Sequence, residues 1–273
     1  MAPDKTNGQQ GTTIASLHGT VHKGPSGPPI VLLHSLAMDA SLWDEHVGEL
    51  TQMARVVTCD LPGHGLSHGT KDVSIEEMAD EVVAFLDSRL SGPVILVGLS
   101  LGGCVAQSLA TRHPAAVVGL LLADTTPWYG PRAPQEWEAR AERARDAGLG
   151  DLAEFQLARW FSPTFLGKRP HLAQRLLEIF QANDLDSYMA TCRAMGHMDL
   201  RPGIGNISVP TTVLVGEIDP ATPVRSAKDL AARIRGARLR VVNGCSHLSP
   251  IEAPEVFLEE IRLLVQDVKE ASA

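Results

Sequence analysis

The chain has 273 residues, of which 44% are hydrophobic, and its formal net charge is −8 at pH 7. This composition can supply a large apolar core, which argues against disorder of the whole chain. The negative charge, with no run of Lys and Arg, makes nucleic acid and anionic membranes poor partners, and no apolar stretch approaches the roughly 20 residues that span a bilayer.

The N-terminal residues 1–11 are polar and lack the apolar segment of a signal peptide, so we expect a disordered tail and a cytoplasmic protein. The four cysteines are scattered, and no Cys-x-x-Cys occurs. Buried free thiols in a reducing compartment fit this pattern better than a zinc site or disulfides. We therefore expect no zinc site.

Short, continuous apolar runs recur along the chain, as expected for strands buried on both faces of a parallel sheet. They cover residues 29–33, 56–59, 94–97, 117–123, 212–215 and 239–242. Helical patterns lie between most of them, including residues 75–90, where Ser74 and Glu77 form a capping box, and residues 254–268. This alternation predicts an α/β fold, with a mostly parallel sheet and helices on both faces.

The alternation lapses over residues 125–210. This stretch contains helical patterns at 135–147 and 173–194 and three tryptophans, but no run typical of a buried strand. We interpret it as a helical cap inserted into an α/β core made of residues 12–124 and 211–273. The cap is the only part large enough to roof a site at the carboxyl edge of the sheet.

The most informative motif is Gly-x-Ser-x-Gly, formed by Gly98, Ser100 and Gly102 between a predicted strand and a predicted helix. So tight a turn strains the backbone at the serine, and side chains at the two glycine positions would collide where strand meets helix. Ser100 then projects its hydroxyl past the end of the sheet, where it can act as a nucleophile. A glycine-rich turn can also cradle phosphates, but the chain lacks both Gly-x-Gly-x-x-Gly and Gly-Lys-Ser/Thr.

A nucleophilic serine needs a histidine base and a carboxylate that orients this base. His247 lies in a Gly/Ser loop between the last predicted strand and the last helix, and we expect it to be the base. Asp219, after the strand at 212–215, is the expected carboxylate. Glu217 lies nearer that strand and could face away, and Asp124 is the alternative carboxylate.

The reaction also needs two backbone N–H donors to stabilise the oxyanion. One is expected from Leu101, the residue after the nucleophile. The other is expected from Leu36, just past the apolar run that ends at residue 33.

With these pieces in order, the chain resembles the α/β-hydrolase superfamily over residues 14–268, including its Ser…Asp…His chain order. The motifs are HSL at 34–36, DLPGHGLS at 60–67, GLSLGG at 98–103, GEIDPATP at 216–223 and HLSPIEAPE at 247–255. A narrower resemblance is to the 3-oxoadipate enol-lactonase (β-ketoadipate enol-lactone hydrolase) group. It rests on HSLAMD at 34–39, LWD at 42–44, RWFSP at 159–163, Tyr188, CRA at 192–194 and DLR at 199–201.

That group opens the lactone ring of an aromatic-degradation intermediate without a metal or cofactor. The resemblance therefore implies a serine hydrolase that acts on a small ester or lactone through an acyl-enzyme. Alternatives on the same fold are a general carboxylesterase with a more apolar substrate, a carbon–carbon bond hydrolase, a perhydrolase and a non-catalytic ligand receptor. The oligomeric state is not predicted.

We expect the cap to set specificity, with Trp128, Tyr129 and Trp160 lining the site, although these aromatics could instead pack the cap's own core. An enol-lactone substrate also carries a free carboxylate, which a partly buried arginine would bind well. Arg159 is the first candidate for this role and Arg193 the second. Either could instead form an ordinary surface ion pair.

Overall fold

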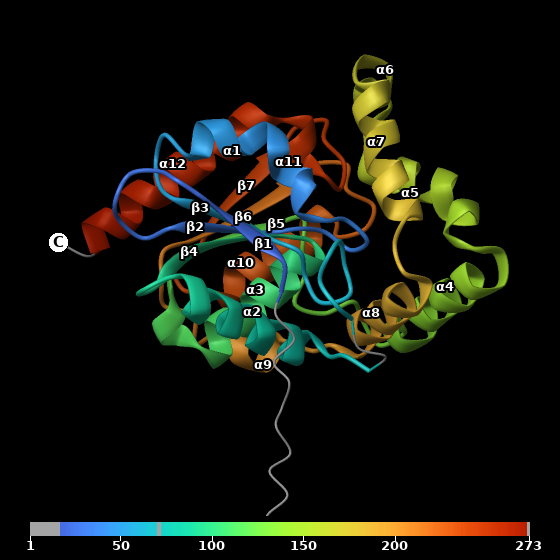
Figure 1. The fold of residues 1–273 in the computed structure, drawn as a ribbon, viewed down its shortest axis with the longest axis horizontal. Coiled ribbons are helices and arrows are strands. Elements are labelled where there is room, and N and C mark those ends of the chain that lie inside the picture. The colour runs from blue at the N-terminus through green and yellow to red at the C-terminus, as the bar shows by residue number, and fades with distance from the viewer. Residues whose placement is uncertain (1–16, 70–71, 272–273) are drawn as a thin grey trace, which may run out of the picture.

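A twisted sheet runs through the middle of the molecule, with its helices arranged around it (Figure 1). The computed structural model describes residues 17–69 and 72–271, and the tail predicted at 1–11 lies outside these ranges. The described sheet has seven strands in the order β1-β3-β2-β4-β5-β6-β7, and only β1 is antiparallel to its neighbour. The strands are β1 (Gly19–His22), β2 (Ile30–Leu33), β3 (Val56–Cys59), β4 (Val94–Leu99), β5 (Val117–Ala123), β6 (Thr211–Gly216) and β7 (Arg238–Val242).

Helices cover both faces of this sheet, which confirms the predicted α/β fold (Figure 1). One face carries α1 (Asp44–Leu50) and α12 (Pro254–Ala271), and the other carries α2 (Ile75–Arg89), α3 (Leu101–Arg112) and α10 (Val224–Arg233). Every residue of β2, β3, β4 and β6 is buried, as the continuous apolar runs predict. The capping box of α2 is present as predicted, since Ser74 accepts from the backbone of Glu77 and donates its own N–H to that side chain.

Most of the helices between β5 and β6 form a separate layer beyond the carboxyl ends of the strands, and the last of these helices packs against α3 (Figure 1). They are α4 (Ala133–Ala147), α5 (Ala153–Trp160), α6 (Pro163–Lys168), α7 (Pro170–Gln181), α8 (Leu185–His197) and α9 (Arg201–Ile204). We call α4–α8 the cap. The helical pattern predicted over 173–194 is divided at Asp184, whose side chain accepts from the backbone N–H of Ser187 and starts α8.

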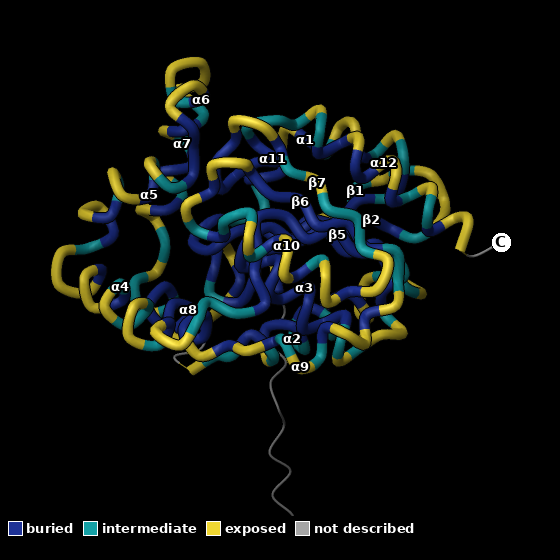
Figure 2. The backbone as a smooth tube through the Cα atoms, turned by 180° about the vertical axis from the view of Figure 1, so that it is seen from behind, coloured by how far each residue is buried: buried dark blue, intermediate teal, exposed yellow. Residues whose placement is uncertain are grey.

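The remaining short elements are α11 (Ser249–Glu252) and the 3₁₀ helices η1 (Ala40–Trp43), η2 (Pro114–Ala116) and η3 (Leu149–Leu152). The central strands β2 to β6 are buried almost throughout, whereas the edge strands β1 and β7 are partly exposed and the cap helices carry both buried and exposed residues (Figure 2). Across the ranges that the structure describes, no helix is both long enough and apolar enough to span a membrane.

Candidate active site

Ser100 stands on the turn that joins β4 to α3, in a conformation that side chains rarely adopt, with φ 54° and ψ −110°. The turn requires glycine on both sides. A Cβ at Gly98 would lie 2.3 Å from the carbonyl oxygen of Gly102, and one at Gly102 would lie 2.3 Å from that of Leu33. The predicted collision between strand and helix is therefore confirmed.

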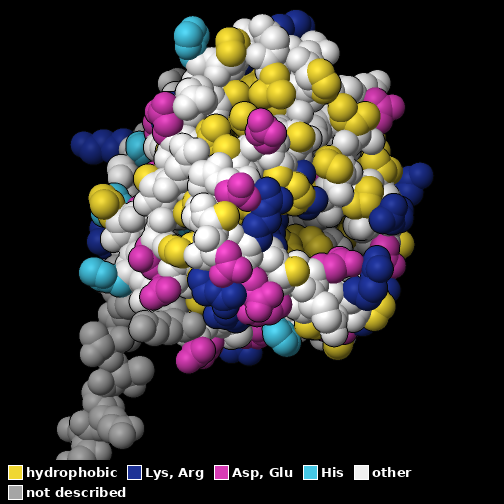
Figure 3. All heavy atoms as spheres, turned by 90° about the vertical axis from the view of Figure 1, so that its right-hand side faces the viewer, with side chains coloured by type: hydrophobic (Ala, Val, Ile, Leu, Met, Phe, Trp, Pro, Cys, Tyr) yellow, Lys and Arg dark blue, Asp and Glu magenta, His cyan; other side chains and the backbone are white. Residues whose placement is uncertain are grey.

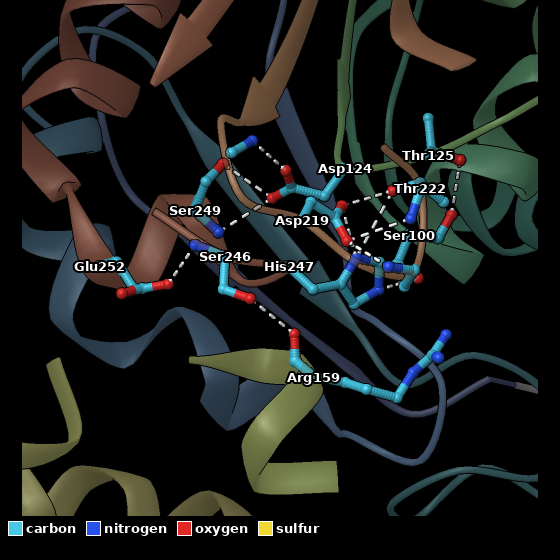
Figure 4. A network of polar contacts seen from close by, with 12 residues as sticks. Ser100, Asp124, Thr125, Arg159, Asp219, Thr222, Ser246, His247, Ser249 and Glu252 are labelled. Atoms are coloured by element: carbon cyan, nitrogen blue, oxygen red, sulfur yellow. Dashed lines mark hydrogen bonds and ion pairs between the residues drawn. The ribbon is translucent and has the colours of Figure 1, made fainter. Parts of the chain in front are cut away.

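Ser100, His247 and Asp219 form a chain of hydrogen bonds at the carboxyl edge of the sheet (Figure 4). The Nδ1–H of His247 donates to Oδ2 of Asp219 at 2.9 Å. Nε2 of His247 lies 2.9 Å from Oγ of Ser100. With Nδ1 protonated, Nε2 is the acceptor, so this arrangement can draw the proton from the serine hydroxyl.

Asp219 is held in place by the turn that follows β6. Its carboxylate accepts from the backbone N–H groups of Ala221 at 2.7 Å and Thr222 at 3.0 Å, and from the Thr222 hydroxyl at 2.6 Å. Burial by itself raises the pKa of Asp219, but His247 and the Thr222 hydrogen bonds lower it overall to about 2. The carboxylate is therefore ionised at neutral pH.

The other two carboxylates considered from the sequence do not contact His247. Asp124 accepts from the backbone N–H of Gly216 at 2.8 Å and from Ser249, through its N–H at 2.9 Å and its hydroxyl at 2.7 Å. Glu217 is exposed. Asp124 thus joins the ends of β5 and β6 to α11.

The loop that carries Leu36 runs past Ser100, and Leu36 and Ser100 line one pocket. Ala37 adopts a left-handed conformation, with φ 57°, and its carbonyl accepts from the Asn183 side chain of the cap at 2.8 Å. Leu101 is the first residue of α3, so its backbone N–H has no acceptor within the helix. Both residues predicted as oxyanion donors therefore lie beside Ser100.

Two buried histidines, His34 and His64, lie side by side next to the loop that carries Leu36. The Nδ1–H of His34 donates to the carbonyl of Ser35 at 2.8 Å, and its Nε2 accepts from the N–H of Leu61 at 2.9 Å. His64 donates from Nδ1 to the carbonyl of Pro62 at 2.9 Å, with its ring centroid 5.2 Å from that of His34. Burial lowers the pKa of both rings, and the nearby His34 adds to the effect on His64, whose pKa is about 3.

The pocket at Ser100 is nearly closed, with a cavity of about 20 Å³. This is room for about one water molecule. Besides Leu36, Ser100 and His247, the cap and the segment leading into it supply most of the lining, namely Tyr129, Trp137, Arg140, Gln156, Arg159 and Trp160.

Two guanidinium groups face this small pocket without a carboxylate partner among the described residues. Arg140 donates from Nε to the hydroxyl of Tyr188 at 2.7 Å, and its guanidinium lies 4.9 Å from the Trp137 ring centroid. Arg159 lies 4.9 Å from the ring centroid of Phe155. Burial, and then the positive charge of Arg140, lower the pKa of Arg159, which reflects two desolvated cations close together.

The sequence profile of the alpha/beta hydrolase family matches residues 30–260. The chain is 30% identical to 3-oxoadipate enol-lactonase 1 of Acinetobacter baylyi, over 97% of each protein. It is also 30% identical to a pimeloyl-(acyl-carrier protein) methyl ester esterase of Nitrosospira multiformis, over 86% of this chain and 93% of the esterase. The crystal structure of the enol-lactonase from Burkholderia xenovorans is similar, with a TM-score of 0.87 and 31% identity over 92% of this chain and 96% of that one.

The chain belongs to the alpha/beta hydrolase family. The β4–Ser100–α3 turn and the mostly parallel sheet are the features that this chain shares with the fold of the family. The protein is a hydrolase.

Three of the five substrate-binding residues predicted for this hydrolase line the pocket, namely Tyr129, Arg159 and Trp160. The other two lie elsewhere. The Trp128 ring is covered by the guanidinium of Arg201, whose centre is 3.5 Å from the ring centroid. Arg193 makes two hydrogen bonds to Glu138, at 2.8 and 2.9 Å, and both side chains are partly exposed. Acidic and basic side chains lie side by side on the face of the molecule that Figure 3 shows.

Five lining residues were not predicted as site residues. Ser35 and Ala221 lie on loops of the core, and Trp137 and Arg140 on α4 and Gln156 on α5 belong to the cap. Arg140 lies on the same side of α4 as its buried alanines, Ala141 and Ala144. An arginine on the apolar face of an amphipathic helix was the available signal. Gln156 is buried, and its Nε2 has no hydrogen-bond partner within the described chain, so the pocket contains one more unpaired donor.

Trp160 belongs both to the pocket and to the cap's own core. Its ring meets that of Phe180 edge-on at 5.5 Å, and Phe180 meets Tyr188 in the same way at 5.7 Å. Over residues 17–69 and 72–271, no group of three or more His, Cys, Asp or Glu side chains is placed to hold a metal ion.

Proposed function

We propose that this protein is a cofactor-free serine hydrolase that opens a lactone carrying a free carboxylate, as the name of its enol-lactonase relatives suggests. Two considerations support the proposal. The hydrogen-bonded chain of Ser100, His247 and Asp219 is suited to acyl transfer. The pocket beside it is lined by two half-buried arginines, Arg140 and Arg159, and neither forms an ion pair with a carboxylate of the described residues.

In this mechanism, the Ser100 hydroxyl attacks the lactone carbonyl and passes its proton to Nε2 of His247. Asp219 stabilises the resulting imidazolium, and the N–H groups of Leu36 and Leu101 stabilise the oxyanion. When the ring C–O bond breaks, His247 returns the proton to the leaving oxygen, which stays tethered to the acyl group. His247 then takes a proton from water, which attacks the acyl-enzyme. When the bond between the acyl carbon and Oγ breaks, His247 returns this proton to Ser100 and the open-chain acid is released.

The two arginines without a carboxylate partner are the observation that favours an acidic substrate. A buried cation without a partner is costly, and a substrate carboxylate offsets this cost only when it binds. Arg159 and Arg140 would hold that carboxylate, and the amide of Gln156 can add a third donor. The aromatic rings of Tyr129, Trp137 and Trp160 would pack against the rest of the substrate.

The test compares an acidic lactone with a neutral lactone of similar size. Arg159→Leu should lower kcat/KM for the acidic lactone on the order of 30-fold or more, because it removes one half of a desolvated charge pair. The same variant should hydrolyse the neutral lactone almost as well as the wild type. Arg140→Leu should show the same selectivity.

Arg193→Leu is the matched control, since this arginine also lies in the cap but pairs with Glu138 at the surface. It should leave both substrates unaffected. A wild type that prefers the neutral lactone, or an equal loss on both substrates in Arg159→Leu, would contradict the acidic substrate. Those results would favour a general esterase.

A further inference from the structure

Glu252, the last residue of α11, joins the His247 loop to the cap. Its Oε1 accepts the backbone N–H of Ser246 at 2.6 Å (Figure 4). Its Oε2 accepts the backbone N–H of Ser162 at 3.1 Å and also the Ser162 hydroxyl. Ser246 immediately precedes His247, and Ser162 lies between α5 and α6. One carboxylate therefore holds both segments.

The end of α5 also pairs directly with the His247 loop. The Ser246 hydroxyl donates to the carbonyl of Arg159 at 2.9 Å, and the N–H of Leu248 donates to the carbonyl of Trp160 at 2.9 Å. The N–H of His247 is directed at the Arg159 carbonyl at 3.4 Å. The backbone of Arg159 and Trp160 is thus hydrogen-bonded to residues on both sides of His247, while the Arg159 guanidinium lines the pocket.

We propose that Glu252 is a positioning residue that acts through Ser246 and Ser162 to set His247 in register with Ser100. The His247 ring is held by Asp219 at one nitrogen, but this contact does not fix the backbone that carries the ring. A shift of about 1 Å would take Nε2 out of hydrogen-bond range of Oγ and can cost on the order of 100-fold in rate.

The chemistry of the bridge explains why a carboxylate is needed. Glu252 accepts three donors and donates none, which an ionised carboxylate does and an amide cannot. Ser162 and Ser246 are both buried, so water cannot replace the lost acceptor. The Ser162 oxygen in turn accepts from the N–H of Phe165 and caps α6, so the bridge continues into the cap.

This inference rests on the proposed role of His247 as the base, but not on the identity of the substrate. The test is Glu252→Gln, which keeps the shape of the side chain and replaces one acceptor with a donor. We expect kcat to fall on the order of 10- to 100-fold for both the acidic and the neutral lactone, with little change in KM. Labelling of Ser100 by a fluorophosphonate should slow in parallel.

Two further variants sharpen the result. Glu255→Gln makes the same change in charge at an exposed position of α12, and should retain wild-type kcat and labelling rate. Ser162→Ala removes the hydroxyl contact to Glu252 and the cap of α6, but it keeps the contact from the Ser162 backbone N–H to Glu252, so it should cause a smaller loss of kcat. Combined with Glu252→Gln, it should add little, because both changes break the same bridge.

All rates are compared at a temperature where circular dichroism shows each variant folded. A lower melting temperature in Glu252→Gln with unchanged kcat and labelling rate would overturn the positioning role and leave a purely structural one. A loss confined to the acidic lactone would also overturn it, because Glu252 would then act on Arg159 and not on His247. If the wild type is not labelled at Ser100, the proposed function fails as well, and that outcome is distinct from equal labelling of wild type and variant.

Discussion

Two buried aspartates lie close to the His247 loop, and their contacts assign them different tasks. Burial and then the Asp219 charge raise the pKa of Asp124, whereas the pKa of Asp219 is lowered to about 2. Asp219→Asn should leave the fold intact and lower kcat on the order of 10⁴-fold, because an amide no longer holds His247 in the tautomer that accepts the serine proton. Steady-state kinetics of the variant measures the loss of kcat, and a melting curve shows whether the fold is intact.

Asp124→Asn is the matched change and should have the opposite profile. Its amide nitrogen would replace an oxygen that accepts from Ser249 or Gly216, so a buried donor would lose its acceptor. We expect a loss of about 1–3 kcal/mol in the free energy of unfolding, with a much smaller effect on kcat. If Asp124→Asn instead abolishes activity and Asp219→Asn is mild, the two assignments are reversed.

At the scale of elements, the turn between β4 and α3 depends on its glycines for space. Gly98→Ala would place a methyl group against the backbone of Gly102, which cannot move without displacing Ser100. We expect this variant to lose both stability and activity. Gly48→Ala, in α1, meets nothing within 4 Å and should raise the free energy of unfolding by about 0.5–1 kcal/mol. Urea denaturation measures the free energy of unfolding of both variants. A Gly98→Ala variant as stable and as active as the wild type would contradict the packing argument.

The strands and the Ser100 turn are predictable from the sequence because their signals are local. A continuous apolar run is enough to indicate a strand buried on both faces, and a Gly-x-Ser-x-Gly turn carries its own steric requirement. No such local signal shows which residues of the cap line the pocket. Whether Arg140 or Arg193 reaches the pocket depends on how α4 and α8 pack. In the structure, Arg193 on α8 forms an ion pair at the surface with Glu138 on α4.

The same distinction separates parts of the candidate site. His247 and Asp219 follow predicted strands, so chain order alone brings them to one edge of the sheet. Glu252 bridges to Ser162, 90 residues away along the chain, and no spacing rule points to such a contact. The motif that contains Glu252, HLSPIEAPE at 247–255, indicates the family but not this contact.

The molecule as a whole should lose stability in mild acid because it buries neutral histidines. The pKa of His64 is about 3 in the folded protein, and that of His34 is also lowered, against 6.5 for an ordinary histidine. Between these values the unfolded chain binds more protons than the folded one, so the free energy of unfolding falls as pH falls. Each ring contributes a slope of up to about 1.4 kcal/mol per pH unit.

Urea denaturation at a series of pH values from about 7 to 4 measures this slope. His64→Asn retains a donor for the carbonyl of Pro62 and removes the titrating group, so its slope should be shallower than that of the wild type. The exposed His68→Asn is the control and should follow the wild type. Equal slopes for all three proteins would contradict a role for the buried ring.

The small cavity at Ser100 has a further consequence for the time course of turnover. An ester that carries both a ring and a carboxylate occupies many times the volume of one water, yet the cavity measures about 20 Å³. For the substrate proposed above, we therefore expect the cap residues that cover Ser100 to move apart before capture, and the frequency of this opening would limit the rate of capture, however fast the bond chemistry is. Because the end of α5 is hydrogen-bonded to the His247 loop, we expect the other cap elements that cover the pocket to make this movement. The elements that move would then be separate from those that hold His247 in place.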